Sequence, residues 1–499
     1  MVEKTFSKLL KQHIKDSGYT NYETARAAEI KRVNLQRYIS GERVPPLHAF
    51  EALLDVVPMS AEEQRELREA YELAADGEDA YYLRRCIREI LENAVDLSGT
   101  SWPENTVEYD EHSEDESRDP IQLIKGSLAV ERFICDRLRE EMAAEHGPDR
   151  HVLLYLPVNH FSERIFHTYT VSGIPTLPDL KITQLIPLSK RSDRVEDQFY
   201  NLRVLKNLIP RCFYLGRSYE TCYYYQKNTE GAGYSAIYPY YGIFKNSVVL
   251  FSGSMEQAVW IRNQEIVKEY RKQFLTAYGR SDVVKPLITY FEDSFTRFHF
   301  LTEQDEVQEE EIKQYAVGYH PCFTLMLAGN LFTSAMYPEN SERTKVLLGR
   351  GNGEIEKSAH FLHYFTKAGL EEFASTGEFA EYPESGVRPL TIKERIHVLD
   401  NIIEISAQEN IEIGLIINEH LDIKLPVNIF HGSTSGLILT LNNKKQRPRH
   451  IQISEPSICH AFWKFIDSMA KWQDVLSADE TRKILAETRK RLKDRLDEN

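Results

Sequence analysis

The sequence predicts a multidomain chain in which an all-α N-terminal bundle precedes a large mixed α/β (α+β) C-terminal region. Three observations support this prediction. The length of 499 residues is more than one hydrophobic core usually serves. Apolar residues recur at helical spacing in the N-terminal part, whereas apolar runs typical of strands start at residue 151. Between them, ENTVEYDEHSEDESRDP (residues 104–120) has the composition of an acidic linker.

Six helices are expected before the linker. Asn21 can cap the second of them, and Pro46 suits the first position of the fourth. Ser60-Ala-Glu-Glu63 forms a capping box for the fifth. The expected helices cover residues 5–16, 22–28, 31–39, from Pro46 onward, from the Ser60 cap to about Ala75, and 80–94.

The C-terminal region mixes strands and helices. Strands are expected at residues 151–157, 181–188, 242–252, 411–417, 435–441 and 449–454. Helices are expected at residues 122–142, 196–209, 255–277, 392–409, 456–473 and 478–496. No internal repeat is visible in the sequence. The predicted domains are 1–58 (DNA-binding), 59–103 (helical extension), the linker and 121–499, which can divide again near 300–345.

Charge is distributed unevenly along the chain. The net charge of −15 argues against a protein that coats nucleic acid or an anionic membrane with its whole surface. Residues 1–60 nevertheless carry +2, whereas residues 61–119 carry −13. Only the N-terminal segment is therefore suited to binding a polyanion.

The chain has the composition of a cytoplasmic protein. Its six cysteines are scattered without a C-x-x-C pair, so neither a disulfide framework nor a zinc site is expected. The sequence MVEKTFSKLLKQHIKD lacks the apolar core of a signal peptide, and no apolar run approaches the roughly 18 residues of a membrane span.

Residues 26–43 hold five Lys/Arg against two acids, Glu29 and Glu42. On a helical wheel for residues 31–39, one side is polar and basic and the other, with Leu35, Tyr38 and Ile39, is apolar. Arginine can bridge guanine O6 and N7, glutamine can bridge adenine N6 and N7, and valine can contact the thymine methyl. A helix-turn-helix that reads the major groove is therefore expected. Its polar side consists of Arg32, Val33, Gln36 and Arg37.

The stretch from residue 21 to residue 54 resembles the XRE (Cro/cI-type) helix-turn-helix family. Ala25 stands where the family keeps a small residue, and GERVP supplies its G-x-x-x-P loop. The resemblance places the base-reading positions on Arg32, Val33, Gln36 and Arg37. It places the backbone-anchoring positions on Asn21, Lys31, Asn34 and Arg43. Three residues depart from the family pattern: Glu29 in place of the usual turn glycine, Thr24 and Ile39.

These observations favour a cytoplasmic, sequence-specific DNA-binding transcriptional regulator that acts on double-stranded DNA as a homodimer, with half-site centres about 34 Å apart. The large C-terminal region loosely resembles the sensor bodies of large one-component XRE-type regulators, which implies an unidentified small-molecule or protein effector. Two alternatives stay open: an enzyme with a DNA-binding appendage, and a protein-interaction body that senses a partner protein.

The C-terminal region shows no catalytic, cofactor-binding or metal-binding motif, so we expect no enzyme and no cofactor. GRGNGE (residues 349–354) lacks the spacing of a phosphate-binding loop. His360 and His363 lie three apart on an expected helix without further ligands, and they are interpreted as ordinary surface or core histidines.

Tyrosines are unusually dense in residues 213–244. Their flat faces and polar tips suit a ligand pocket. Packing of a twisted sheet explains the same residues, because aromatic residues favour strands. The candidate pocket residues are Tyr219, Tyr223, Tyr225, Tyr238, Tyr240 and Tyr241.

Overall fold

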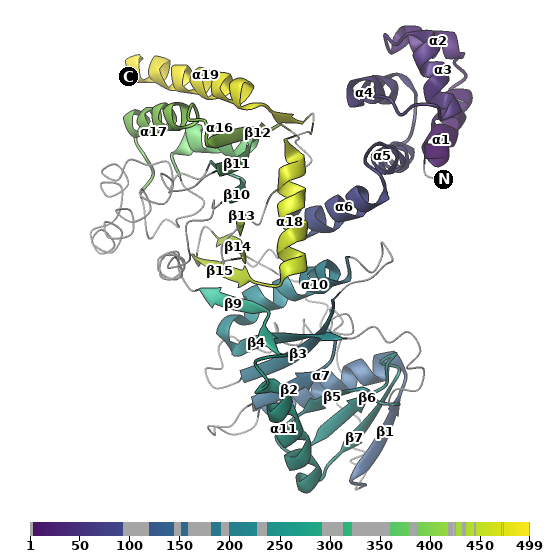
Figure 1. The fold of residues 1–499 in the computed structure, drawn as a ribbon, viewed down its shortest axis with the longest axis vertical. Coiled ribbons are helices and arrows are strands. Elements are labelled where there is room, and N and C mark those ends of the chain that lie inside the picture. Colours follow the sequence, from purple (N-terminus) through teal and green to yellow (C-terminus); the bar gives the residue numbers. More distant parts are fainter. Residues whose placement is uncertain are drawn as a thin grey trace. The chain divides into compact units, whose positions relative to one another are not determined.

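The fold is taken from a computed structural model of residues 1–499 (Figure 1). The structure describes residues 3–92, 119–143, 151–157, 181–190, 199–226, 237–291, 313–321, 360–378, 388–417, 423, 426–431, 436–443, 446–470, 472 and 474–498. The chain divides into two compact units: unit 1 comprises Met1–Arg88 and Asp193–Phe199, and unit 2 comprises Glu89–Ser192 and Tyr200–Asn499. A helical region precedes a mixed α/β region, so the predicted multidomain fold class is confirmed.

All six expected N-terminal helices are present, with ends shifted by one or two residues. They are α1 (Glu3–Asp16), α2 (Asn21–Ala27), α3 (Arg32–Ser40), α4 (Leu47–Val56), α5 (Ala61–Asp76) and α6 (Glu78–Glu92). The prediction that Asn21 caps α2 is wrong. The cap is Thr20, whose side chain accepts a hydrogen bond from the Glu23 amide, while the Glu23 carboxylate bonds back to the Thr20 amide. Threonine followed three residues later by glutamate makes a capping box, which outcompetes a lone asparagine one residue further on.

The core of unit 1 draws on α1 to α5. Phe50 of α4 stacks on Tyr71 of α5 with ring centroids 3.9 Å apart, and Phe6 of α1 meets both rings edge-on. The Arg68 guanidinium of α5 also forms two hydrogen bonds to the Glu51 carboxylate of α4, at 2.7 and 3.1 Å. The core therefore continues past residue 58, where the sequence analysis ends the DNA-binding domain.

Unit 2 contains two eight-stranded mixed sheets. Sheet 1 has the strand order β1-β7-β6-β5-β2-β3-β4-β8. Its strands are β1 (Ile121–Lys125), β2 (His151–Tyr155), β3 (Lys181–Ser189), β4 (Tyr219–Gln226), β5 (Tyr240–Ile243), β6 (Val248–Phe251), β7 (Gln257–Ile261) and β8 (Lys285–Pro286). The strands β2, β3 and β4 are parallel, and all other neighbours in sheet 1 are antiparallel.

Sheet 2 has the strand order β16-β12-β11-β10-β13-β14-β15-β9. Its strands are β9 (Ile288–Phe291), β10 (Lys313–Gly318), β11 (His360–Thr366), β12 (Ile411–Ile416), β13 (Val427–His431), β14 (Gly436–Asn443), β15 (Gln446–Ile453) and β16 (Val475–Leu476). Here β10, β11 and β12 are parallel and the other neighbours are antiparallel.

The two sheets are tandem copies of one topology. Each strand of sheet 1 corresponds to the strand numbered eight higher in sheet 2, with the same neighbours and the same parallel or antiparallel pairing. We refer to the described residues of 121–286 as repeat 1 and to those of 288–476 as repeat 2. No repeat is visible in the amino-acid sequence, and the duplication is seen in the strand order. Two sheets can share a strand order when apolar strands occur at equivalent positions along the chain. Such sheets need not have the same amino acids, so the repeat is not visible as sequence similarity.

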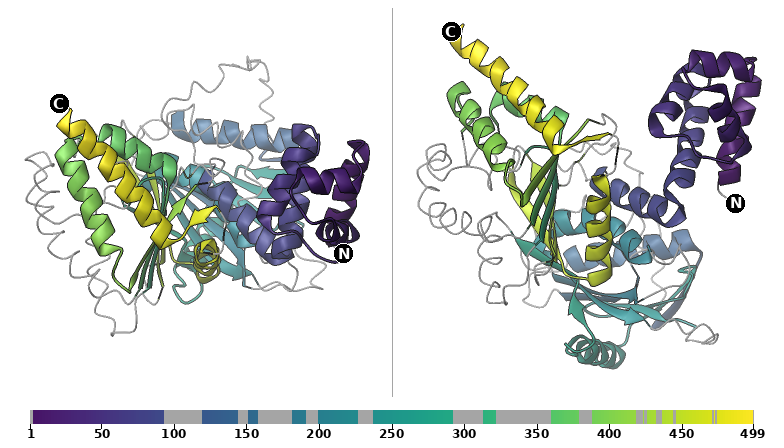
Figure 2. Two further views of the ribbon diagram at one scale, coloured as in Figure 1. Left: turned by 90° about the horizontal axis from the view of Figure 1, so that it is seen from above. Right: turned by 45° about the horizontal axis from the view of Figure 1, so that its top comes forward.

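The helices of unit 2 follow the same plan. A helix precedes the third parallel strand in each repeat: α10 (Tyr200–Leu215) before β4 and α17 (Ile392–Ile405) before β12. Another follows the antiparallel strands: α11 (Gln264–Tyr278) after β7 and α18 (Pro456–Met469) after β15. The other helices in the described part of unit 2 are α7 (Ser127–Ala143), α16 (Lys367–Thr376) and α19 (Ala478–Asp497). Figure 2 shows α17 and α19 side by side, where Leu399 and Leu485 belong to one buried cluster with Phe361 of β11.

Several C-terminal predictions differ from the structure, and three of them concern segments that contain short strands. Residues 255–277 hold strand β7 before α11, and residues 122–142 hold strand β1 before α7. The segment 242–252 is two strands, β5 and β6, joined by the exposed turn residues Lys245 and Asn246. In each case a short strand adjoins another apolar element, and the hydrophobic pattern alone does not separate the two.

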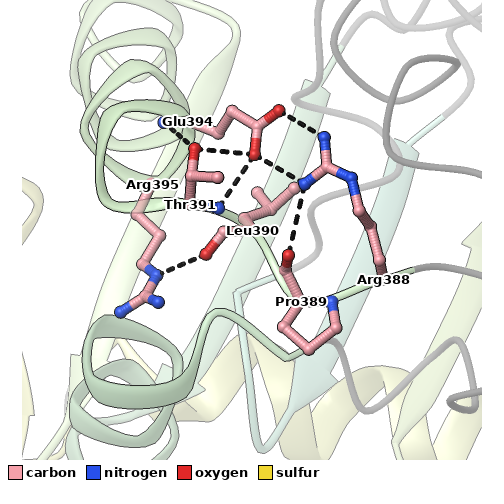
Figure 3. A network of polar contacts seen from close by, with 6 residues as sticks. All are labelled: Arg388, Pro389, Leu390, Thr391, Glu394 and Arg395. Carbon is pink, nitrogen blue, oxygen red and sulfur yellow. Dashed lines mark hydrogen bonds and ion pairs between the residues drawn. The ribbon is translucent and has the colours of Figure 1, made fainter.

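The start of α17 shows how one end of a helix is fixed (Figure 3). Thr391 caps the helix in a capping box with Glu394, and the Arg388 guanidinium holds the same carboxylate through two hydrogen bonds of 2.7 and 2.8 Å. These bonds lower the pKa of Glu394 to about 2, chiefly through Arg388. Arg395 donates to the carbonyls of Leu390 and Ala374, at 2.8 and 3.0 Å, and thereby joins α17 to the end of α16.

Several predictions concern residues outside the described part of the chain. These are the linker up to residue 118 and the GRGNGE loop. Most of the interval 300–345 also lies outside it, so a module boundary there stays a prediction; the change from sheet 1 to sheet 2 occurs earlier, between Pro286 and Ile288. Among the described helices, none has both the length and the apolar character that crossing a membrane requires.

Candidate nucleic-acid interface

Helices α2 and α3 are joined by a tight turn at Glu29. The Glu29 backbone has a φ of 54°, in the left-handed region, and lies between Ala28 and Ile30. The Ile30 amide donates to the Ala25 carbonyl at 2.8 Å, which returns the chain toward α2. Ala25 is buried, and its small side chain leaves room for the two helices to approach. The expected helix-turn-helix geometry is therefore formed by α2, this turn and α3.

Helix α3 has one buried side and one exposed side. Leu35 and Tyr38 are buried, with exposed fractions of 0% and 3%. On the opposite side Val33 is 65% exposed although it is apolar, and Arg32, Gln36 and Arg37 are also exposed. The four predicted base-reading side chains thus project together from α3, with long donors flanking one apolar residue.

The predicted backbone-anchoring residues surround this surface. Lys31 is the N-cap residue of α3 and is exposed, and Asn34 is half-buried one turn further on. Asn21 is the first residue of α2 and is half-buried. Arg43 is exposed in the loop after α3. The assignment of these residues to DNA phosphates stays a prediction.

The loop after α3 is held in place by α5. The Tyr71 hydroxyl, which is buried, donates to the Pro45 carbonyl at 3.0 Å. Pro45 is itself buried and lies two residues after Arg43 in the same loop. The sequence analysis placed α5 outside the DNA-binding domain, yet this contact makes α5 part of the support for the candidate interface.

Glu42 is a residue to which the sequence analysis gave no role. Its carboxylate Oε1 lies 3.5 Å from the Nε of Arg37, and the two side chains are 65% and 48% exposed. Gly41, with a φ of 72°, ends α3 and turns the chain so that Glu42 returns toward Arg37. The signal available in the sequence was this glycine, because a residue after a helix-ending glycine is directed back over the last turn.

The tyrosine-rich tract is divided between two faces of sheet 1. Tyr241 pairs with Tyr155 in the sheet register and shares its face, where Tyr155 stacks on Tyr241 and Tyr224 at 5.0 and 5.6 Å. Tyr270 of α11 meets Tyr241 edge-on at 5.1 Å. These rings belong to a cluster that packs α11 onto the sheet.

The other candidate pocket residues lie elsewhere. Side chains alternate along a strand, so the odd-numbered tyrosines of β4 and Tyr240 of β5 lie on the face opposite α11. Tyr238 precedes β5 and is half-buried. The six candidates therefore do not converge on one face, and a ligand pocket stays a prediction. The odd-numbered tyrosines of β4 are Tyr219, Tyr223 and Tyr225, of which the first two are buried.

The two singled-out histidines lie on strand β11, and the prediction of a helix there is wrong. An alternating run of large apolar and aromatic residues fits a buried strand as well as a helix. His363 is buried between the rings of Phe361 and Phe365, and burial lowers its pKa to about 4. His360 is half-buried, three residues earlier. Within the described ranges, no cluster of three or more His, Cys, Asp or Glu could hold a metal ion.

A buried carboxylate joins the two repeats. Glu455, with an exposed fraction of 0%, precedes α18 and accepts a hydrogen bond from the Ile458 amide at 2.9 Å. Its two oxygens also accept from the Tyr225 hydroxyl of β4 and the Ser457 hydroxyl, both at 2.6 Å. Asn201 of α10 donates to Ser457 at 2.9 Å. Burial and the bond to Glu455 raise the pKa of Tyr225, so this hydroxyl keeps its proton and donates.

Comparison with known proteins adds little to this description. No family model matches the sequence, and no curated protein matches it. Among solved structures, TrmBL2, an archaeal chromatin protein with a novel mode of DNA binding, matches 54% of this chain and 88% of its own, at 12% identity and a TM-score of 0.21. Phosphatidylserine synthase from Haemophilus influenzae Rd KW20 matches 75% of this chain and 92% of its own, at 10% identity and a TM-score of 0.23. At such TM-scores, neither likeness supports an argument about function.

Proposed function

We propose that this chain is a sequence-specific DNA-binding transcriptional regulator of the XRE type, in which α3 enters the major groove. The observation that carries the proposal is the exposed surface of α3. Arg32 and Arg37 offer paired donors for guanine and Gln36 can bridge adenine. The 65% exposure of Val33, an apolar side chain, is explained by contact with a thymine methyl.

The resemblance of residues 21–54 to the XRE family supports the same role. The structure forms the elements that this resemblance requires, namely a small residue at Ala25, a tight turn at Glu29 and a loop after Gly41. The left-handed backbone at Glu29 accounts for the family's preference for glycine at that position, since glycine adopts positive φ without steric cost.

The remaining parts of the proposal concern unit 2. We propose that unit 2 senses an effector, either a small molecule or a partner protein, rather than catalysing a reaction. We also propose a homodimer, because one short helix reaches too few base pairs for tight specific binding and paired half-sites place two heads about 34 Å apart on the duplex. Such a regulator acts in the cytoplasm, where it reaches chromosomal DNA.

The test is the binding of the full chain to a fluorescent duplex over a salt series. Affinity is expected to fall steeply between about 50 and 200 mM salt, because phosphate contacts release counterions. Lys31→Ala is expected to weaken binding to every sequence alike and to reduce the slope of log affinity against log salt by about 1. Lys8→Ala, which removes an exposed lysine of α1, is the matched control. Salt-independent binding, or equal effects of both variants, would contradict the proposal.

A further inference from the structure

The end of α3 brings the side chains of residues 37 and 42 together. The Gly41 amide donates to the Tyr38 carbonyl at 3.2 Å, and the Glu42 amide donates to the Arg37 carbonyl at 3.0 Å. Together with the left-handed φ of Gly41, these two bonds form a Schellman motif. In that motif the residue after the glycine lies over the residue five positions earlier, and the pair is commonly apolar. Here the pair is an ion pair, Glu42 with Arg37.

The ion pair engages one part of the Arg37 guanidinium. The contact runs from Glu42 Oε1 to the Nε of Arg37, at 3.5 Å. Among the described residues, the guanidinium has no second charged partner. Its two Nη groups therefore remain available for an acceptor on another molecule. A bidentate contact to guanine needs two such donors in a fixed plane.

Charge alone would make Glu42 unfavourable near DNA. It is the single acid between Ile30 and Leu47, in a segment where the candidate interface is otherwise basic. A carboxylate here repels phosphate, so it lowers the affinity for any DNA sequence. Its contact with the Nε of Arg37 can compensate by restricting the rotamers of this long side chain before binding, so that less conformational entropy is lost when DNA binds.

We propose that Glu42 is a positioning residue that holds Arg37 in the orientation required for reading guanine. Glu42 thereby raises the preference of the protein for its own DNA sequence, while its negative charge lowers the affinity for DNA of any sequence. This inference rests on the proposed function of α3. It assigns Glu42 no contact with DNA. Its effect is exerted through Arg37, and it depends on the turn that Gly41 makes.

The experiment selects duplexes from a randomised pool with the full chain and then compares the enriched duplex with a scrambled one. Glu42→Gln is expected to lower the ratio of the two affinities about threefold to tenfold, with the loss concentrated at one base pair. Affinity for the scrambled duplex is expected to stay level or rise, because a negative charge is removed. Glu29→Gln is the matched control: it removes the other acid of residues 26–43, which lies before α3, and it is expected to leave the ratio unchanged.

A double variant and the behaviour of the wild-type chain distinguish a failure of the positioning role from a failure of the proposed function. In an Arg37→Ala background, Glu42→Gln is expected to leave the ratio unchanged, since the side chain that it positions is gone. An unchanged or higher ratio for Glu42→Gln alone, or the same loss in both backgrounds, overturns the positioning role while DNA binding stands. If the wild-type chain enriches no sequence, the proposed function itself fails and this inference fails with it.

Discussion

Glu29 stands in a backbone conformation that side chains other than glycine seldom adopt. Its φ of 54° costs of order 1 kcal/mol for a residue with a Cβ atom. The sequence analysis anticipated this turn from the family pattern, in which glycine is usual. The residue is exposed, so the strain comes from the backbone and not from crowding of the side chain.

Replacement of Glu29 by glycine is therefore expected to stabilise the turn. The gain is a few tenths to about 1 kcal/mol, because the greater freedom of glycine in the unfolded chain offsets part of the relief. Hydrogen exchange of the amides from Ala28 to Leu35 in the full chain measures this gain in stability. Glu29→Ala keeps the backbone strain and serves as the control. Equal protection in the two variants would show that φ at residue 29 costs nothing.

Some residue roles could not be predicted from the sequence. The exposed and buried sides of α3 followed from its helical period, since Leu35 and Tyr38 recur three apart. The contact of Glu42 with Arg37 did not, because it depends on the direction of the chain after Gly41. The division of the tyrosines between two sheet faces also depends on strand register, which the sequence does not state.

At the scale of single elements, the end of a helix decides much of its stability. Helix α17 begins in a network where Glu394 accepts hydrogen bonds from the Thr391 backbone and side chain and from Arg388. The Glu394 carboxyl is mostly buried, with 18% of the side chain exposed, and its pKa is lowered to about 2. A group whose pKa is lower in the folded state stabilises the fold above its unfolded pKa and loses that effect as pH falls.

Glu394→Gln is expected to destabilise α17 at neutral pH by roughly 1–3 kcal/mol. The difference from the wild type should shrink as the pH drops below about 4.5 and should be lost below about pH 2, where the wild-type carboxyl also becomes protonated. Hydrogen exchange of the α17 amides at a series of pH values measures this difference in stability between the variant and the wild type. Glu480→Gln alters a capping box at α19 in which Ser477 supplies the bonds, and it is expected to have the smaller effect. A Glu394→Gln effect independent of pH would exclude the ion pair as its cause.

Helices and strands were predicted correctly where the hydrophobic pattern is long, and the prediction failed where a short strand adjoins another element. The capping box at Ser60 and the apolar face of α4 placed two helices within a residue or two. Strand β7 was absorbed into the predicted helix at 255–277, because QAVWI is five residues of mixed pattern directly before α11. Strand β11 was assigned to a helix for a similar reason, since HFLHYFT is apolar on both faces.

At the scale of the whole molecule, unit 2 is a duplicated sheet, and the buried Glu455 carboxylate links its two copies. Asn263 and Glu455 occupy corresponding places: each lies two residues after the strand that precedes it, β7 or β15, and each caps the helix that follows. Among the described residues, the Asn263 side chain accepts hydrogen bonds from backbone amides of its own helix alone. Glu455 also reaches Tyr225 of the other repeat.

This difference yields a paired prediction. Glu455→Ala is expected to cost about 2–3 kcal/mol, because it removes a helix cap and leaves the half-buried Tyr225 hydroxyl without its acceptor. Asn263→Ala is expected to cost about 1 kcal/mol. In hydrogen exchange, Glu455→Ala should reduce protection in β4 and α10 of repeat 1 as well as in α18, whereas Asn263→Ala should affect α11 alone. Loss confined to α18 would mean that Glu455 does not join the repeats.

The duplication itself could not be predicted. Segments such as NSVVLFS in repeat 1 and SGLILTL in repeat 2 share an apolar strand pattern but few residues. Strand order depends on which strands pair over long sequence distances, and apolar patterns leave that choice open. The fold class, in contrast, follows from element types alone, which is why it could be predicted.

The central claim is that Arg32 and Arg37 of α3 read base pairs. Selection of duplexes from a randomised pool by the full chain tests it most directly, with Arg32→Ala, Arg37→Ala and, as a control, Arg65→Ala, an exposed arginine of α5. Each α3 variant is expected to lose preference at one base pair, at a cost of roughly 1–3 kcal/mol per half-site, while Arg65→Ala keeps the wild-type preference. Identical base preferences in the wild type and both α3 variants would contradict the account.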